Sequence, residues 1–389
     1  YTVDLLCTNY NKDEKITDLL KNYTFYIIPK ISPDGSDVYL HSDQRLRSVN
    51  RNYPLSELAD GLHPGDIDGD GAIRMMRVKT PYGAWKVSEK DPQVMTKRTP
   101  FDVQGDFYNI YPEGEIINYD GLHIELAKEK WGLDFNRNYP FGWFSEVRQP
   151  GAGKYPLSNP ENKAVADFVL AHPNIGFVST LHTTGGVLVY PPGTYPEAKA
   201  LKKDMDLFKK VGKMAKQIMG YETVNIFDGF LTDIENYSSG AFDDWCYETQ
   251  GIPAYTIELW NLFERAGADM SWPRKDKDDD VQEAEYAMVL KWIKENIGES
   301  AIKPWTAYDH PQLGTVEIGG FDYKFIHQNP PCDYLLQEVE KTAKFMLANA
   351  YALPKLKFES VKTEKICDGI YKLEAVLGNT GYMPTYLTD

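Results

Sequence analysis

The stretch FVSTLHTTGGVLVYPP (177–192) sets one histidine between two apolar runs that have the composition of β-strands. Gly185 and Gly186 break the chain after His182, and the second apolar run follows at once. A lone histidine in such a place is more often a satisfied core residue than a functional group. A functional role for His182 therefore requires partner residues elsewhere in the chain.

Strands and helices alternate on both sides of this stretch. TFYIIPKI (24–31) predicts a buried strand that ends at the turn SPDG (32–35). SNPENKAVADFVLAHP (158–173) and the amphipathic stretch 197–219 predict helices, and GIPAYTIELW (251–260) predicts another strand. This alternation predicts an α/β fold, in which a central sheet carries helices on both faces.

Two regions depart from the alternation. Residues 55–128 are rich in Gly, Pro and Asp and contain few apolar runs, so we interpret them as an insertion. After Pro354 the pattern changes to short strands separated by turn residues. We therefore expect one domain over 1–350, with the insertion at about 55–128, and a truncated β-sandwich that starts over 355–389.

Composition excludes several classes of protein. The chain has 389 residues, a formal net charge of -15 and a pI near 5.0, which argues against a nucleic-acid partner. No apolar stretch approaches the roughly 20 residues needed to cross a bilayer, so we expect no membrane span. The four cysteines are widely spaced and form no C-x-x-C pair. No signal peptide is present, but the first residue is Tyr, so this absence says little about export.

Three further stretches contain residues that could do chemistry. Glu258 is one acid in the apolar strand AYTIELW, and it either points to solvent or acts as a general base with a raised pKa. Asn136 and Arg137, in DFNRNYPFGW, form either an ordinary turn or a fork suited to gripping a carboxylate. Tyr237, in ENYSSGAFDDW, precedes a Ser-Ser-Gly loop that could let its ring swing.

A candidate calcium site lies in the insertion. In DIDGDGAIRMMR (66–77), Asp66, Asp68 and Asp70 alternate as in the first half of an EF-hand-type loop. Arg77 stands where the bidentate glutamate of such a loop is expected. The alternatives are a calcium site that orders the insertion and an ordinary Asp-Gly turn on the surface.

Together these stretches resemble the zinc carboxypeptidases of the pancreatic carboxypeptidase A and B type. The resemblance covers about residues 15–298, in the family's order, through ISPDG, HSDQRLRS, DFNRNYPFGW, YPLSNPENKAVADFV, FVSTLHTTGGVLVYPPG, YSSGAFDDW and YTIELW. Beyond Trp305 the chain resembles larger bacterial relatives that carry a β-sandwich. The resemblance implies a mixed central sheet, zinc-dependent release of one C-terminal amino acid from peptides or proteins, a monomer, and a secreted or periplasmic location.

The resemblance also assigns roles around the reacting bond. His182 would be a zinc ligand and Glu258 the general base that takes a proton from the attacking water. An arginine in 45–51 would stabilise the oxyanion, and we choose Arg47, with Arg45 and Arg51 as alternatives.

Other roles concern the substrate's terminal residue. Asn136 and Arg137 would bind its carboxylate, and Tyr237 would close over it. In the family, an aspartate two residues before the tryptophan of the Ser-Gly-x-x-x-x-Trp stretch goes with a preference for lysine or arginine. That position is Asp243 here, so we expect release of basic residues. Because the loop before Trp245 is one residue shorter than in the pancreatic enzymes, Asp244 could be the buried acid, with Asp243 pointing to solvent.

One family motif is missing. The family takes its other two zinc ligands from a His-x-x-Glu motif, and none of the seven histidines here has a glutamate three residues later. We expect the motif immediately upstream of Tyr1, so that the chain as given binds zinc poorly and is inactive. The alternative is a noncatalytic peptide- or glycan-binding relative that has lost the zinc site.

Overall fold

The centre of the molecule is a four-stranded mixed sheet. The computed structural model describes residues 1–231, 233, 235, 237–385 and 388. The sheet has the order β7-β10-β8-β9, in which β10 is parallel to β7 and antiparallel to β8, and β8 is parallel to β9. Its strands are β7 (Val178–Thr183), β8 (Val187–Tyr190), β9 (Glu222–Asn225) and β10 (Ala254–Leu259).

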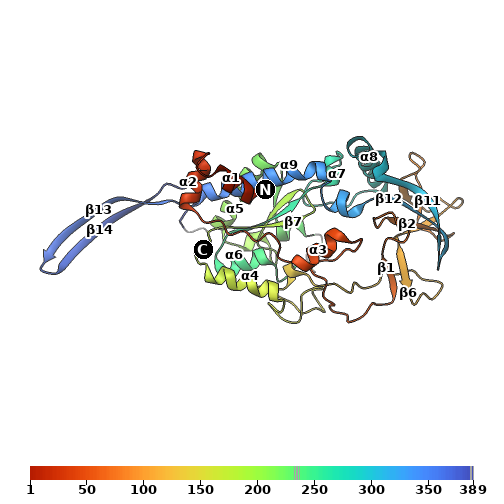
Figure 1. Cartoon of the computed structure of the whole chain (residues 1–389), viewed down its shortest axis with the longest axis horizontal. Helices are drawn as coiled ribbons and strands as arrows, with labels where there is room; N and C mark the ends of the chain where they lie inside the picture. Colours follow the sequence, from red (N-terminus) through yellow and green to blue (C-terminus); the bar gives the residue numbers. More distant parts are fainter. Residues whose placement is uncertain (232, 234, 236, 386–387, 389) are drawn as a thin grey trace.

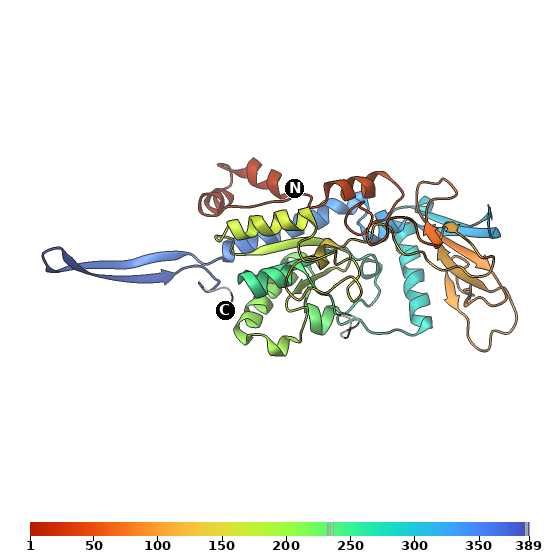
Figure 2. The same ribbon diagram turned by 90° about the horizontal axis from the view of Figure 1, so that it is seen from below.

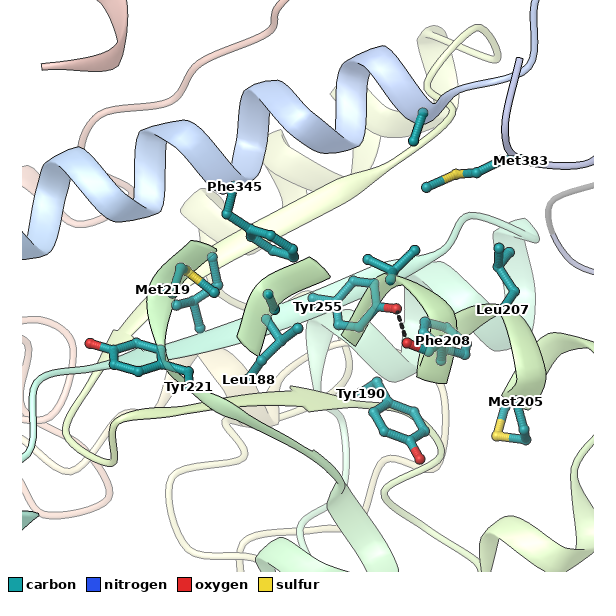
Figure 3. Close-up of a cluster of buried hydrophobic side chains, with 14 of the residues drawn as sticks. Leu188, Tyr190, Met205, Leu207, Phe208, Met219, Tyr221, Tyr255, Phe345 and Met383 are labelled. Carbon is teal, nitrogen blue, oxygen red and sulfur yellow. Dashed lines mark hydrogen bonds between the residues drawn. The ribbon is translucent and has the colours of Figure 1, made fainter. Parts of the chain in front are cut away.

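Helices cover both faces of this sheet, and successive side chains of β10 pack into apolar clusters on opposite faces. Tyr255 and Ile257 pack with α5 (Lys202–Met219) and α9 (Cys332–Ala352) in the largest apolar cluster, where the Tyr255 hydroxyl donates to the Phe208 carbonyl at 2.8 Å (Figure 3). Ala254 packs on the opposite face in the cluster built by α4 (Pro160–Ala171) and α6 (Phe242–Gln250). The prediction of an α/β fold with helices on both faces of a mixed sheet is confirmed.

The remaining helices lie around this core. They are α1 (Thr2–Asn9), α2 (Glu14–Asn22), α3 (Pro33–His41), α7 (Leu262–Arg265) and α8 (Asp279–Asn296). Short helical turns occur at Phe135–Arg137, Glu197–Lys199, Ile226–Phe230, Glu299–Ala301 and Tyr323–Gln328. No helix among the described residues is long and apolar enough to span a membrane.

The N-terminal prediction of a strand over 24–31 is wrong. The segment is extended but belongs to no sheet, and Ile27 and Ile28 are 42% and 52% exposed. The sequence SPDG does not make a simple turn either, because Pro33 is the first residue of α3. Apolar composition favours a strand, but without a neighbouring strand the backbone has no ladder to join.

The insertion forms strands of its own and pairs with a distant segment. A six-stranded sheet of order β11-β12-β2-β5-β3-β4 joins it to residues 302–321, at the end of the molecule opposite the C-terminal hairpin (Figures 1 and 2). These strands are β2 (Met75–Lys79), β3 (Trp85–Val87), β4 (Met95–Lys97), β5 (Tyr108–Pro112), β11 (Ile302–His310) and β12 (Gly314–Phe321). A separate pair joins β1 (Gly61–Pro64) to β6 (Gly114–Ile117).

The C-terminal strands β13 (Leu356–Cys367) and β14 (Ile370–Asn379) form a hairpin that projects from the body (Figure 1). Its register puts Phe358 opposite Leu377 and Thr363 opposite Leu373 on one face. The other face carries charged cross-strand pairs such as Lys362 with Glu374. One apolar face and one charged face are typical of a sheet that packs against a second one. The expected β-sandwich over 355–389, like the division from 1–350, stays a prediction.

Candidate active site

Glu258 and His182 lie side by side on neighbouring strands. The parallel register of β10 and β7 pairs these two residues directly, so their side chains leave the same face of the sheet. Burial raises the pKa of Glu258 to about 7, although the charge of Arg47 opposes the shift. Burial also lowers the pKa of His182. A carboxylate and an imidazole are thus placed together in a poorly hydrated position, where proton transfer near neutral pH is possible.

The turn after β7 packs closely against Glu258. Gly185 donates its backbone N–H to the Trp260 carbonyl at 2.9 Å, which fastens the turn to the end of β10. A Cβ atom at position 185 would come within 3.0 Å of the Glu258 Cβ. Glycine therefore permits the close approach that brings the two strand ends together.

Of the three candidate oxyanion arginines, Arg47 is the one whose charge shifts the pKa of these two groups, while its Nε atom donates to Asp134 at 2.8 Å. Arg51 instead forms a bidentate ion pair with Glu161, at 2.6 and 2.7 Å. Arg45 stacks over the Tyr323 ring, with its guanidinium 4.4 Å from the ring centre. The geometry favours Arg47, and its role stays a prediction.

Asn136 and Arg137 belong to a short helical turn that is tied to the start of α6. The Asn136 Oδ1 atom accepts a hydrogen bond from the Phe242 backbone N–H at 2.8 Å. The Tyr139 N–H donates to the Gly240 carbonyl at 2.9 Å, and a Cβ at Gly240 would come within 2.5 Å of the Arg137 carbonyl oxygen. This is not a loose surface turn. The only Asn136 atom left for a ligand carboxylate is the Nδ2 donor.

Tyr237 packs in an aromatic group beside this turn. Its ring centre lies 5.9 Å from that of Phe144 and 6.2 Å from that of Phe227. The Arg148 guanidinium lies 5.5 Å from the centre of the Tyr237 ring. The neighbouring Ser239 is held by a hydrogen bond from its N–H to Gln149 at 3.0 Å. That Tyr237 closes over a substrate stays a prediction.

Asp243 and Asp244 are both buried, at 2% and 1% exposure, so the alternative in which Asp243 points to solvent is wrong. The Asp243 Oδ2 atom accepts from the Thr256 hydroxyl at 2.8 Å, two residues before Glu258 on β10. Asp244 turns to the loop after β8, where its Oδ1 accepts from the Gly193 N–H at 2.8 Å. Burial, reinforced by the charge of Asp243, raises the pKa of Asp244. Asp243 is thus the acid that faces the Glu258 side of the sheet.

The residues around His182 do not form a three-ligand zinc site. Among the described residues, the only group of three histidine, cysteine or acidic side chains close enough to hold a metal is Asp66, Asp68 and Glu113. His182 belongs to no such group. One imidazole cannot supply the three protein ligands that a catalytic zinc requires.

The acidic group in the insertion differs from the set expected from the sequence. The ligand atoms of Asp66, Asp68 and Glu113 lie within 4.8 Å of one another. Asp70 turns to Arg74 at 2.7 Å and to Lys303 at 2.8 Å, and Lys303 also pairs with Asp68. Glu113 is fully buried, and burial raises its pKa to about 7. No local spacing could have indicated Glu113, because it comes from the turn between β5 and β6.

Comparison with known proteins identifies the family of this chain. The chain belongs to the zinc carboxypeptidase family, whose model matches residues 1–273. The members are metallocarboxypeptidases, hydrolases that act on the C-termini of peptides.

Curated relatives match parts of the chain. Carboxypeptidase A1 of Mus musculus is 32% identical over 139 residues, which are 33% of this chain and 32% of the relative. Carboxypeptidase O of Bos taurus is 31% identical over 176 residues, covering 40% of this chain and 45% of the relative. The chain thus spans about a third to a half of the length of these relatives.

Among solved structures, the thrombin activatable fibrinolysis inhibitor is 18% identical, with a TM-score of 0.37. The match covers 76% of this chain and 57% of that one. The carboxypeptidase A from Helicoverpa armigera is 21% identical, with a TM-score of 0.27, and the match covers 42% and 40% of the two chains.

Proposed function

We propose that this chain carries the general base and the substrate-binding groups of a zinc-dependent carboxypeptidase that releases a basic C-terminal amino acid. The observation that supports it most is the direct pairing of Glu258 with His182 across β10 and β7, beside the charge of Arg47. Peptide and protein C-termini would be the substrates. By family resemblance we also propose a secreted or periplasmic monomer.

Each group then has a distinct task. Glu258, ionised above a pH of about 7, takes a proton from the attacking water and passes it to the leaving amine. Arg47 stabilises the negative charge that develops on the carbonyl oxygen. Arg137 and the Asn136 Nδ2 bind the terminal carboxylate, because a guanidinium and an amide offer convergent donors. Asp243 receives the basic side chain at the base of its pocket.

The zinc of this family would polarise the scissile carbonyl, and His182 would be one of the ligands of that zinc. The described residues form no group of three ligands that includes His182. We therefore propose that this chain alone is inactive but still binds a C-terminal carboxylate.

The experiment is calorimetric titration of the chain with N-acetyl-arginine and with its C-terminal amide. We expect the carboxylate form to bind at least about 10-fold more tightly, because charge-assisted bidentate hydrogen bonds to Arg137 need both carboxylate oxygens. Arg137→Gln should remove that difference. Arg51→Gln is the matched control and should keep it, since Arg51 is engaged by Glu161. Equal binding of acid and amide by the unaltered chain would contradict the proposal.

The alternative is a noncatalytic relative that keeps the groove for peptides or glycans. A peptide-binding relative would show the same carboxylate preference, so binding alone does not separate it from the enzyme. The coding sequence upstream of Tyr1 does separate them. A His-x-x-Glu motif encoded there supports the enzyme, whereas a start codon without such a motif leaves the binding relative.

We propose in addition that the acidic group of the insertion binds calcium through Asp66, Asp68 and Glu113. Lys303 pairs with Asp68 and neutralises part of the charge of this group, and a bound cation would neutralise the remaining charge on Asp66 and the buried Glu113. Millimolar calcium should raise the melting temperature at pH 8, and Glu113→Gln should abolish the increase. Asp120→Asn, at an exposed acid elsewhere in the insertion, is the control. An unchanged melting temperature in the unaltered chain would rule the site out.

A further inference from the structure

Two loops of the six-stranded sheet, 80–84 and 98–107, expose large apolar side chains almost completely. Tyr82, in the connection between β2 and β3, is 89% exposed, and Phe101, in the connection between β4 and β5, is 91% exposed. Val103, in the second loop, is 75% exposed. Single exposed apolar residues are normal on a protein surface, but a group of them on one surface indicates an interaction site.

One arginine holds the two loops together. The Arg98 Nη1 atom donates to the Pro81 carbonyl at 3.0 Å, and its Nε atom donates to the Asp102 carbonyl at 2.9 Å. The first of these carbonyls directly precedes Tyr82 in the chain, and the second directly follows Phe101. Both loops therefore form one end of the sheet, which we name the apolar tip.

The backbone of the apolar tip makes its hydrogen bonds locally. Pro81 and Pro100 have no N–H to donate. The Tyr82 N–H donates to the threonine hydroxyl two residues earlier at 3.4 Å. The N–H groups of Asp102 and Val103 donate to carbonyls of their own loop, each at 3.0 Å. A backbone that is satisfied in this way can enter surroundings that offer no hydrogen bonds.

The charges around the apolar tip permit contact with phosphate groups. Asp102 pairs with Lys86 at 2.6 Å, and Asp106 pairs with Lys79 at 2.8 Å. Arg98 adds one further cation, which donates to backbone carbonyls. These groups sum to a small positive charge, whereas the formal net charge of the whole chain is -15. The tip is therefore a part of this acidic protein that phosphate headgroups do not repel.

We propose that the apolar tip docks on a lipid membrane and inserts Tyr82 and Phe101 at the boundary between headgroups and acyl chains. Aromatic side chains favour this boundary, because the ring leaves water while a hydroxyl such as that of Tyr82 stays hydrated. A sugar ligand would need free polar groups beside the rings, and here the residue directly before each ring is a proline. The inference goes beyond the proposed function, since it concerns where the protein is held and not what it hydrolyses.

The test is co-sedimentation of the chain with phosphatidylcholine vesicles, prepared with and without phosphatidylglycerol. We expect the unaltered chain to bind both kinds of vesicle. The double variant Tyr82→Ser, Phe101→Ser should lower the partition coefficient at least about 10-fold, because two aromatic side chains no longer leave water. Leu122→Ser is the matched control, since it removes a side chain of 79% exposure from another loop of the insertion, and it should leave binding unchanged.

Two outcomes would overturn the inference directly. One is an unaltered chain that binds neither kind of vesicle, and the other is a double variant that binds as well as the unaltered chain. None of these substitutions touches the groups proposed to bind a substrate carboxylate. Failure of membrane docking therefore leaves the proposed function standing, and failure of the carboxylate titration leaves the apolar tip standing.

Fluorescence distinguishes lipid from other partners of the apolar tip. Phe101→Trp adds a tryptophan whose emission should shift to the blue on vesicles and be quenched by brominated lipids, relative to the unaltered chain. Sedimentation velocity without lipid reports whether the tip joins two copies of this chain. A dimer that the double variant dissociates, without quenching of the added tryptophan by lipid, would assign the tip to a second copy. Retention on insoluble chitin without vesicle binding would assign it to a glycan, and either result overturns the inference.

Discussion

Asp243→Ile should reverse the ligand preference of this chain from N-acetyl-arginine to N-acetyl-phenylalanine. In the unaltered protein, the buried Asp243 carboxylate can pair with a cationic side chain, whereas an aromatic one would leave it desolvated and unpaired. With isoleucine in its place, the cation is the group left without a partner. Loss of one member of a buried charge pair costs about 2 to 5 kcal/mol, so arginine binding should fall about 30-fold or more. Calorimetric titration with both ligands measures the ranking.

The control is Asp206→Ile, which makes the same chemical change at an exposed position on α5. It should leave the ranking as it is. Because Asp243→Ile also removes the hydrogen bond from Thr256, melting curves of the variant are needed to show that it is folded. A preference for phenylalanine in the unaltered chain, or an unchanged ranking in a folded Ile variant, means that Asp243 does not select the ligand.

Glu338→Ala should destabilise the protein by about 3 kcal/mol, the second large effect we expect. Glu338 is 1% exposed on α9, and three groups donate to it: the Tyr221 hydroxyl, Arg265 at 2.7 Å and Lys341 at 2.8 Å. Removing the carboxylate leaves two cations without their counter-ion. Breaking a buried ion pair on one side costs about 3 to 5 kcal/mol, and the partial exposure of Arg265 argues for the lower end. Urea unfolding gives the free energy.

The pH dependence of this network has a definite sign. Burial would raise the pKa of Glu338, but hydrogen bonds from Lys341 and Tyr221 and the charge of Lys341 lower it overall. The stabilisation is therefore present above the ordinary carboxyl pKa, and is lost as the pH falls through the lowered value. Glu338→Ala should thus cost less in acid than at pH 7. Glu295→Ala, in an exposed pair with Lys291, should change the free energy of unfolding by less than about 1 kcal/mol.

Local sequence was sufficient to predict β7 and β10 and the groups that they carry. The runs around His182 and Glu258 are apolar and β-branched over a strand's length, and both are strands of the sheet. The same reasoning failed for 24–31, where the composition is equally apolar but no strand pairs with it. An apolar segment forms a strand only if another strand pairs with it, and the local sequence does not show whether such a strand is present.

In the insertion, composition predicted loops where the structure has strands. Its Gly, Pro and Asp content indicated loops, yet it supplies four strands of a six-stranded sheet whose other two come from 302–321. Within that sheet, Arg77 pairs with Glu317, and its guanidinium lies 4.7 Å from the ring centres of both Tyr108 and Trp305. Because Arg77 and Glu317 are 240 residues apart, no local sequence pattern could predict their ion pair.

Strand composition, a lone acid in an apolar run and an Asn-Arg pair are legible within a few positions, so the local sequence was enough to select the candidate residues. Contacts between distant segments set which of these groups meet. The register of β10 on β7 put Glu258 beside His182, the packing of α6 buried Asp243 behind Thr256, and Asp134 accepted a hydrogen bond from Arg47. The physical reason is that pairing and burial are decided by the free energy of the whole chain, in which contacts between distant segments compete for the same faces.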